Sequence, residues 1–371
     1  MANTEASYES LMSLEDLSTL PVDQCLAHIG QLVDLSMDLK RMEGLERAVV
    51  LSQELQARSL DPHHLTTCEY FLANAWSNIG RLSKGTPDQA WAWEQEELES
   101  EITHLRRALR GHALSQLRDG LACQILTNLG NAMDHVGRFV EAIAYWDNAL
   151  QRAESFQMAL GNRGVGLTRY ASQLYDRHEA TVLLSHAHTD LTKALSAELP
   201  EHARRIFDDC RLGIEADIPP EQRDLHALSM DEPIGARSDD ETRYRLWALR
   251  NRLFLSPFND LGPYPSAAED LLTTPSIVVG LAEGPYYAGF FNQMKQDFVS
   301  ARYLYYEGIK RSPPHFSDRK VLLFNTMDYP VYCLAAEKAK AAFRIAYSLF
   351  DKIAYFLNHY LALSIGERNA G

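Results

Sequence analysis

The segment Leu126–Arg152, LTNLGNAMDHVGRFVEAIAYWDNALQR, decides the fold of this 371-residue chain. It predicts two short antiparallel helices with a break at Gly137 between them. Leu129 and Gly130 stand on the first helix where a neighbouring backbone must come close, since a glycine hydrogen takes little room. On the second helix, small and aromatic residues recur at i, i+4 and i+7, which places them on one face: Ala142, Trp146 and Ala149. We therefore expect a helix–turn–helix unit.

This order of small and aromatic residues resembles the tetratricopeptide (TPR) repeat, a helical hairpin of about 34 residues. Weaker hairpins of the same kind are expected at 32–55, 66–110 and 157–196. Inside the second of these, Thr86-Pro87-Asp88-Gln89 has the pattern of a helix cap. Because one such unit cannot bury its apolar face alone, the resemblance implies a stacked array with a binding surface.

Composition favours a cytoplasmic protein. Hydrophobic residues make up 46% of the chain, yet no apolar run reaches the ~18 residues of a membrane span. The first residues, MANTEASYESLMSLEDLS, lack the basic and apolar regions of a secretory signal. The five cysteines are scattered without C-x-x-C spacing, so we expect reduced thiols and no metal or other cofactor. A net charge of −14 excludes a general nucleic-acid coat, although a local basic patch is compatible with it.

Two long helices are predicted near the C-terminus, Tyr287–Lys310 and Val331–Leu363. Apolar residues of the second recur at alternating steps of four and three, the seam of a helix packed on an antiparallel partner: Ala335, Ala339, Ala342, Ala346, Leu349, Ile353, Phe356 and Tyr360. Upstream, the prolines of residues 216–240 predict a linker or long loop. Ser238-x-x-Glu241 predicts the capped start of a helix.

These features predict an all-α fold, a TPR-like helical-hairpin solenoid followed by a long-helix segment. We expect an N-terminal tail or first helix at 1–20, TPR-like repeats at 21–215 and a linker or long loop at 216–240. A connecting helix with an ordered loop is expected at 241–284, and a partial helical domain at 285–371.

Three stretches of the C-terminal part resemble one family: KAAFRIAYSLFDKIA (Lys340–Ala354), WALRNRLFLSPFNDLG (Trp247–Gly262) and FVSARYLYYEG (Phe298–Gly308). They are similar to the HEPN superfamily of α-helical domains, in the bacterial subgroup that carries TPR-like repeats at the N-terminus. The resemblance covers residues 20–365. It implies an RNA-binding domain or a metal-independent endoribonuclease, commonly in antiviral defence or stress systems.

The HEPN resemblance also implies a catalytic signature, an Arg followed by a His after four to six intervening residues. The Arg would stabilise the charged phosphorane while the His moves the proton of the 2′-hydroxyl. This spacing occurs for Arg106 and Arg107 with His112, in the repeat region. Arg368-Asn369 begins such a pattern without completing it, so the HEPN-like segment looks incomplete. No catalytic residue is assigned.

Two sets of residues are candidates for binding. Asn128, Asn131 and Asn162 lie on the first helices of hairpins, where amides can bind a protein or peptide; hydrogen bonding between repeats is the alternative. A second set of basic residues accompanies a stripe of aromatic side chains that could stack on RNA bases, or else form core: Lys295, Arg302, Arg311 and Arg344. The C-terminal helices are further expected to form a homodimer.

Two patterns resemble sites of other kinds. His186-x-His188-x-Asp190 has the letters of a metal motif, but on a helix residues i and i+2 point to different sides, which favours surface residues. The glycines of residues 161–166 have no preceding strand, which favours close helix packing over a phosphate loop. The leading hypothesis is a defence- or stress-associated HEPN protein that targets or binds RNA and docks a partner on its repeats. The alternative is a non-enzymatic TPR adaptor for a protein or peptide.

Overall fold

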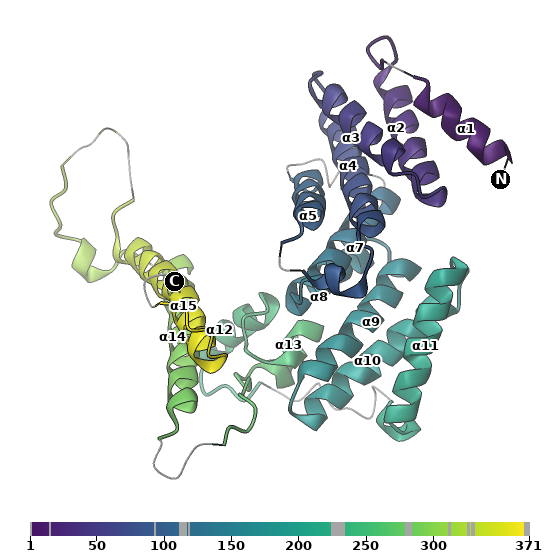
Figure 1. Cartoon of the computed structure of the whole chain (residues 1–371). Helices are drawn as coiled ribbons and strands as arrows, with labels where there is room; N and C mark the ends of the chain where they lie inside the picture. Colours follow the sequence, from purple (N-terminus) through teal and green to yellow (C-terminus); the bar gives the residue numbers. More distant parts are fainter. Residues whose placement is uncertain are drawn as a thin grey trace. The chain divides into compact units, whose positions relative to one another are not determined.

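The predicted all-α fold is confirmed. The computed structural model describes residues 2–14, 16–92, 94–110, 117, 119–223, 234–278, 284–310, 313–324, 327 and 331–366, and these ranges contain helices but no strand (Figure 1). Two compact units divide the chain: Met1–Leu174 with His178–Leu228, and Tyr175–Arg177 with Ser229–Gly371. Within the described ranges, none of the helices combines the length and hydropathy that crossing a membrane requires.

The first unit is a succession of helices that pair with their neighbours along the chain, coloured from purple to teal in Figure 1. Their bounds are α1 (Ala2–Met12), α2 (Val22–Asp38), α3 (Met42–Gln56), α4 (Pro62–Ser83), η1 (Pro87–Trp91), α5 (Glu96–Ala108), α7 (Asp119–His135), α8 (Phe139–Arg152), α9 (Gln157–Gln173), α10 (Arg177–Leu195), α11 (Glu201–Asp217) and η2 (Pro220–Gln222). Leucines of α2, α3 and α4 form one continuous apolar core, with Leu32, Leu45 and Leu72 fully buried.

The hairpin predicted from residues 126–152 is confirmed as the pair α7 and α8. Gly137 separates the two helices with a φ of 76°, a left-handed value that glycine adopts without strain. Gly130 does accommodate a close neighbour, but this is the indole of Trp146 and not a backbone: a Cβ on Gly130 would lie 2.5 Å from the indole Nε1. Trp146 is 1% exposed.

The glycines of α9 serve helix packing, as the absence of a preceding strand predicted. A Cβ on Gly161 would lie 2.0 Å from the Phe207 ring, and one on Gly164 would lie 2.6 Å from Leu191. Only glycine at these positions lets α10 and α11 approach α9 so closely, because real side chains do not overlap at such distances.

Both predicted helix caps are confirmed. The Gln89 Oε1 accepts hydrogen bonds from the backbone N–H groups of Gly85 and Thr86, 2.7 and 3.2 Å away. In the second unit, the Ser238 Oγ accepts from the Glu241 N–H at 3.2 Å, and the Glu241 side chain reaches back to the Arg237 N–H at 2.8 Å. These bonds satisfy donors that would otherwise lack a partner at the first turn.

The second unit contains α12 (Asp239–Arg250), α13 (Pro257–Leu261), η3 (Pro265–Ala267), α14 (Tyr286–Ile309), η4 (Phe316–Asp318) and α15 (Leu334–Tyr360). The two predicted long helices are confirmed as α14 and α15, which pack as an antiparallel hairpin (Figure 1). A Cβ on Gly308 would lie 2.8 Å from the Ala335 carbonyl oxygen, so the two helix backbones approach closely at this end. Glu307 pairs with Lys338 at 3.0 Å, and Asp297 pairs with Lys352 further along.

The seam of α15 differs in detail from the predicted stripe. Ala342 is buried as expected, but Ala346 is exposed and Ile345 is partly covered in its place. An α-helix with 3.6 residues per turn rotates away from a strict spacing of 3.5, which moves the contact face by a residue along a long helix. Of the segment 276–281, where a short strand was an alternative, residues 276–278 have no regular structure and residues 279–281 lie outside the described ranges.

Candidate functional site

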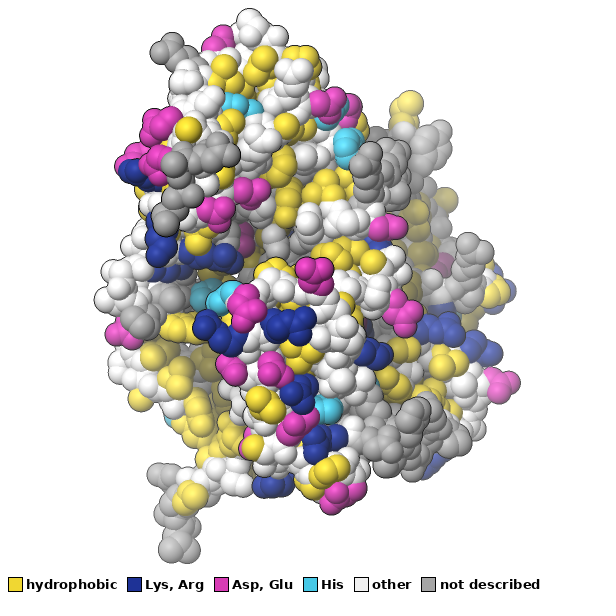
Figure 2. Space-filling view, turned by 90° about the vertical axis from the view of Figure 1, so that its right-hand side faces the viewer, with side chains coloured by type: hydrophobic (Ala, Val, Ile, Leu, Met, Phe, Trp, Pro, Cys, Tyr) yellow, Lys and Arg dark blue, Asp and Glu magenta, His cyan; other side chains and the backbone are white. Residues whose placement is uncertain are grey.

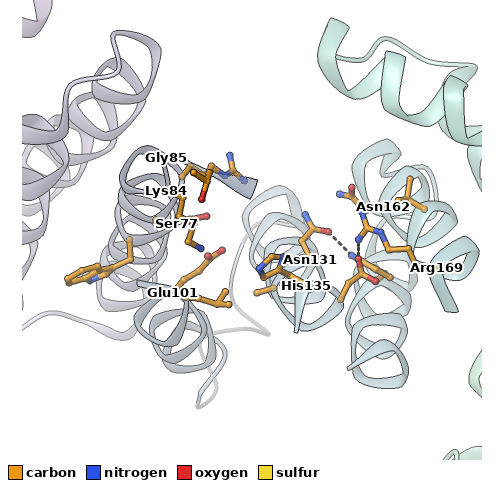
Figure 3. A pocket seen from close by; sticks show the side chains of 17 residues that line it. Ser77, Lys84, Gly85, Glu101, Asn131, His135, Asn162 and Arg169 are labelled. Atoms are coloured by element: carbon orange, nitrogen blue, oxygen red, sulfur yellow. Dashed lines mark hydrogen bonds and ion pairs between the residues drawn. The ribbon is translucent and has the colours of Figure 1, made fainter. Parts of the chain in front are cut away.

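A cavity of about 660 Å³ opens in the first unit (Figure 3). Its walls come from α4, α5, α7, α8 and α9 and from the connector that follows α4. The volume lies within the range of about 300–1,000 Å³ that is typical of small-ligand sites. Since these helices are held by the packing of their neighbours, the cavity is part of the array's architecture.

Two of the three predicted binding asparagines line this cavity. Asn131 lies between the side that carries Lys84 and the side that carries Asn162 (Figure 3). Its Oδ1 accepts a hydrogen bond from the Trp146 Nε1 at 3.1 Å, which fixes the amide. Asn128 is not among the lining residues; its Nδ2 donates to the Asn74 Oδ1 at 3.2 Å, a bond between helices α7 and α4.

Two polar atoms of the cavity wall are buried without a hydrogen-bond partner among the described residues, the Asn162 Nδ2 and the Asp134 Oδ1. Asp134 is only 7% exposed, and Arg169 binds its other carboxylate oxygen. Burial raises the pKa of Asp134, although Arg169 opposes the rise. An unpaired buried donor or acceptor costs about 1–3 kcal/mol. The cavity wall thus carries one unpaired donor and one unpaired acceptor among the described residues.

The opposite side of the cavity is basic. Arg81 and Lys84 end helix α4, and the Lys84 Nζ donates to the Gln95 Oε1 at 2.5 Å. Glu101 of α5 faces them; burial raises the pKa of its carboxyl to about 7, while Ser77 and the two basic side chains pull it down. Around neutral pH this carboxyl is therefore about half protonated, and the positive charge of Arg81 and Lys84 is only partly balanced.

A second cavity of about 950 Å³ adjoins the first and shares Asp134, His135 and Arg169 with it. Trp91 of η1 stacks on His135 with ring centroids 4.8 Å apart and remains 70% exposed. The far wall carries carboxylates: Glu94, Glu96 and Glu99. Charge thus changes sign from one cavity to the next, which suits a ligand with an anionic end in the first cavity.

The histidine motif of α10 has a structural role. Arg163 of α9 lies between Asp190, at 2.7 Å, and Asp147. His186 lies near this cluster, and burial, aided by the charge of Arg163, lowers its pKa to about 4. His188 instead faces Glu215 at 2.9 Å. In the part of the chain that the structure describes, no group of His, Cys, Asp and Glu side chains is arranged to hold a metal ion.

The predicted RNA-contacting residues of the second unit have different environments. Arg344 is exposed on α15, and the Lys295 Nζ donates to the Leu272 carbonyl oxygen at 3.0 Å. Arg302 is buried: it makes two bonds of 2.8 Å to Asp270 and one of 2.7 Å to the Tyr244 hydroxyl. These bonds hold α14 against the segment before it. Arg311 lies outside the described residues.

The aromatic stripe of α14 divides between packing and surface. Phe290 stacks on Phe356 of α15 at 6.0 Å, and the Tyr287 hydroxyl lies 3.0 Å from the His359 Nδ1. These rings form much of the hairpin contact, as the alternative interpretation proposed. Tyr286 and Tyr303 remain about half exposed, at 48% each.

A further apolar stripe on α15 was not singled out from the sequence. Phe343, Tyr347 and Phe350 are 69%, 63% and 71% exposed. Their spacing of four and then three places them on one side of the helix, and that spacing was the available signal. Large exposed apolar surfaces of this kind commonly mark interaction sites.

The molecule is thus an all-α protein with an array of helical hairpins and a separate unit that ends in a long antiparallel hairpin. Residues 278–371 match the family model described as LA2681-like HEPN. The chain therefore carries an LA2681-like HEPN domain at these residues, preceded by an all-helical N-terminal region. Neither a curated protein nor a solved structure matches the chain.

The matched segment contains two histidines, His315 and His359. Arg311 precedes His315 with three residues between them, one fewer than the shortest spacing of the expected signature. His359 is exposed at the end of the hairpin, beside the Tyr287 hydroxyl. These two side chains are the histidines that the domain itself offers for proton transfer.

Proposed function

We propose that this protein is an RNA-targeting HEPN protein whose helical array recognises a ligand or partner through the cavity of Asn131 and Asn162. The observation that carries the proposal is the match of residues 278–371 to a HEPN family, since HEPN resemblance implies RNA binding or cutting. The cavity, with its unpaired donor and acceptor, supports a separate recognition role for the array.

The charge distribution favours a local RNA contact over a broad one. Figure 2 shows Lys and Arg side chains interspersed with Asp and Glu side chains over the face in view, and the chain carries a net charge of −14. An extended RNA would be repelled by much of such a surface. Arg344 is exposed on α15, where it offers a positive charge for a phosphate at one place.

Fluorescence anisotropy of labelled single-stranded and hairpin RNA, titrated with the full chain, tests the RNA role. We expect binding that weakens as salt rises, and a loss of several-fold in affinity for Arg344→Glu because a phosphate contact becomes a repulsion. Arg205→Glu, which changes an exposed arginine of α11 in the first unit, is the matched control and should bind like the wild type. Absence of RNA binding at low salt, or equal losses in both variants, would contradict the proposal.

Cleavage is the property that separates the leading function from the alternative, a non-enzymatic adaptor that binds a protein or peptide through the array. Labelled transfer RNA is incubated with the protein and with His315→Ala and His359→Ala variants. If the domain is a ribonuclease of the HEPN type, one of these changes should abolish cleavage while RNA affinity is kept. RNA that is bound but stays intact with every protein would favour the adaptor.

A further inference from the structure

We propose that the first cavity binds a nucleoside monophosphate, with the phosphate beside Arg81 and Lys84 and the edge of the base beside Asn162 and Asp134. The inference rests on the recognition role proposed above for this cavity and names its ligand class. It does not depend on RNA binding by the second unit. In Figure 3, Lys84 and Asn162 lie on opposite sides of the cavity, which requires an elongated ligand with two different ends.

The charge of the cavity indicates an anion. Its wall contains three permanent cations: Arg81, Lys84 and Arg169. Against them stand two carboxyls, Asp134, which Arg169 pairs, and Glu101, whose pKa of about 7 leaves it only partly ionised. The site is therefore positive within a chain of net charge −14. A local excess of positive charge in an acidic protein concentrates anions there and excludes cations.

The hydrogen-bonding groups at the other end indicate a planar polar group. The Asn162 Nδ2 supplies a donor and the Asp134 Oδ1 an acceptor, and both are buried without a partner among the described residues. A nucleobase presents an acceptor and a donor side by side on one edge, as adenine does with N7 and the 6-amino group. A base edge bound at this end would offer an acceptor to the Asn162 Nδ2 and a donor to the Asp134 Oδ1, which would recover the cost of burying them.

An acidic peptide also carries both amide groups and a negative charge, so it is the competing ligand class. The size of its charge fits the cavity less well than that of a nucleotide. A single terminal carboxylate brings one negative charge, whereas a phosphate monoester carries about −1.5 to −2 near pH 7 and three acceptor oxygens. Arg81 and Lys84, with Glu101 about half neutralised beside them, leave a net of about one and a half positive charges, which a phosphate matches better than a single carboxylate does. The cavity volume of about 660 Å³ is ample for a mononucleotide.

Isothermal titration calorimetry on the full chain tests the proposal with the four ribonucleoside 5′-monophosphates, the corresponding nucleosides, inorganic phosphate, and an acidic peptide with a free C-terminus. We expect at least one monophosphate to bind at least tenfold more tightly than its nucleoside and than phosphate alone. The double variant Arg81→Ala/Lys84→Ala should reduce its affinity to that of the nucleoside. Asn162→Ser should weaken the nucleotide and the nucleoside alike.

Lys193→Ala, at an exposed lysine of α10 outside the cavity, is the matched control and should leave the affinity unchanged. Melting temperatures establish that each variant is folded, and Arg81 and Lys84, at the partly exposed end of α4, can be changed with little loss of stability. Binding of the peptide without the nucleotides, binding of phosphate as tight as that of any nucleotide, or no binding at all would overturn the inference. If Arg344→Glu loses RNA affinity but still binds the nucleotide, the RNA contact belongs to the second unit and the nucleotide inference stands.

Discussion

The indole of Trp146 packs directly against Gly130: a Cβ at residue 130 would lie 2.5 Å from the indole Nε1. Gly166 of α9 contacts the six-membered ring of the same indole: a Cβ on Gly166 would lie 2.4 Å from its Cη2 and Cζ3 atoms. The indole thus joins α7, α8 and α9, and its N–H holds the Asn131 amide that lines the cavity. The packing that makes the hairpin also sets the geometry of the candidate site.

Gly130→Ala should destabilise the first unit, because the added methyl group meets a fully buried ring that has no room to move. We expect a loss of about 1–3 kcal/mol in the free energy of unfolding, measured by urea denaturation followed by circular dichroism. Gly213→Ala is the matched control: it lies in α11, and a Cβ there meets no atom within 4 Å. Because alanine favours helix, this change should be neutral or stabilising by up to about 1 kcal/mol. Equal effects of the two changes would contradict the packing argument.

Arg163→Met should be strongly destabilising, because it removes the arginine that pairs with the buried carboxylates of Asp147 and Asp190. Breaking a buried ion pair from one side costs about 3–5 kcal/mol. Arg211→Met removes an arginine from pairs at the surface of α11 and should cost less than about 1 kcal/mol. Chemical denaturation of both variants measures the difference. Similar midpoints would mean that the buried cluster contributes little.

Local features of the array could be predicted from the sequence because they depend on neighbours in the chain. Helical spacing indicated the buried face of Trp146, Gly137 indicated the turn, and the Gln89 and Glu241 caps lie within four residues of the groups they bind. The α14–α15 hairpin likewise follows from two long apolar patterns. Each of these signals lies within one helix or at one helix end.

The candidate site could be predicted only in part, because it is assembled from distant residues. Asn131 and Asn162 were named from their helix positions, but Arg81, Glu101 and Asp134 come from three different helices and meet only in the packed array. The sequence also gives no measure of burial for a single arginine. Arg302 looks like a surface cation among aromatics, yet its bonds to Asp270 lie inside the second unit.

The stability of the first unit should depend on pH through Glu101. Its folded pKa of about 7 exceeds the ordinary value of 4.5, so the folded state binds a proton more tightly than the unfolded chain does. Stability from this group is therefore fully present below pH 4.5 and is lost as pH rises from 4.5 to about 7, by up to about 3 kcal/mol in all. Glu101→Gln removes the penalty, so it should stabilise the protein at pH 8 and have little effect at pH 5. Thermal melts at both pH values, compared with Glu99→Gln on the exposed side of α5, measure this; a shift that is equal at the two pH values would contradict the assignment.

The exposed stripe of α15 should carry the expected homodimer. A two-fold axis near Tyr347 would pack the stripe against its copy in antiparallel fashion, so that its exposed apolar side chains become buried between the two copies. We expect the full chain to have the mass of a dimer in light scattering after gel filtration.

Phe343→Asp/Phe350→Asp should convert it to a monomer, because charges cannot be buried unpaired in an apolar contact. Phe316→Asp changes an equally exposed phenylalanine away from α15 and should leave the mass unchanged. A wild-type monomer, or a dimer that survives the double change, would show that the stripe has another role.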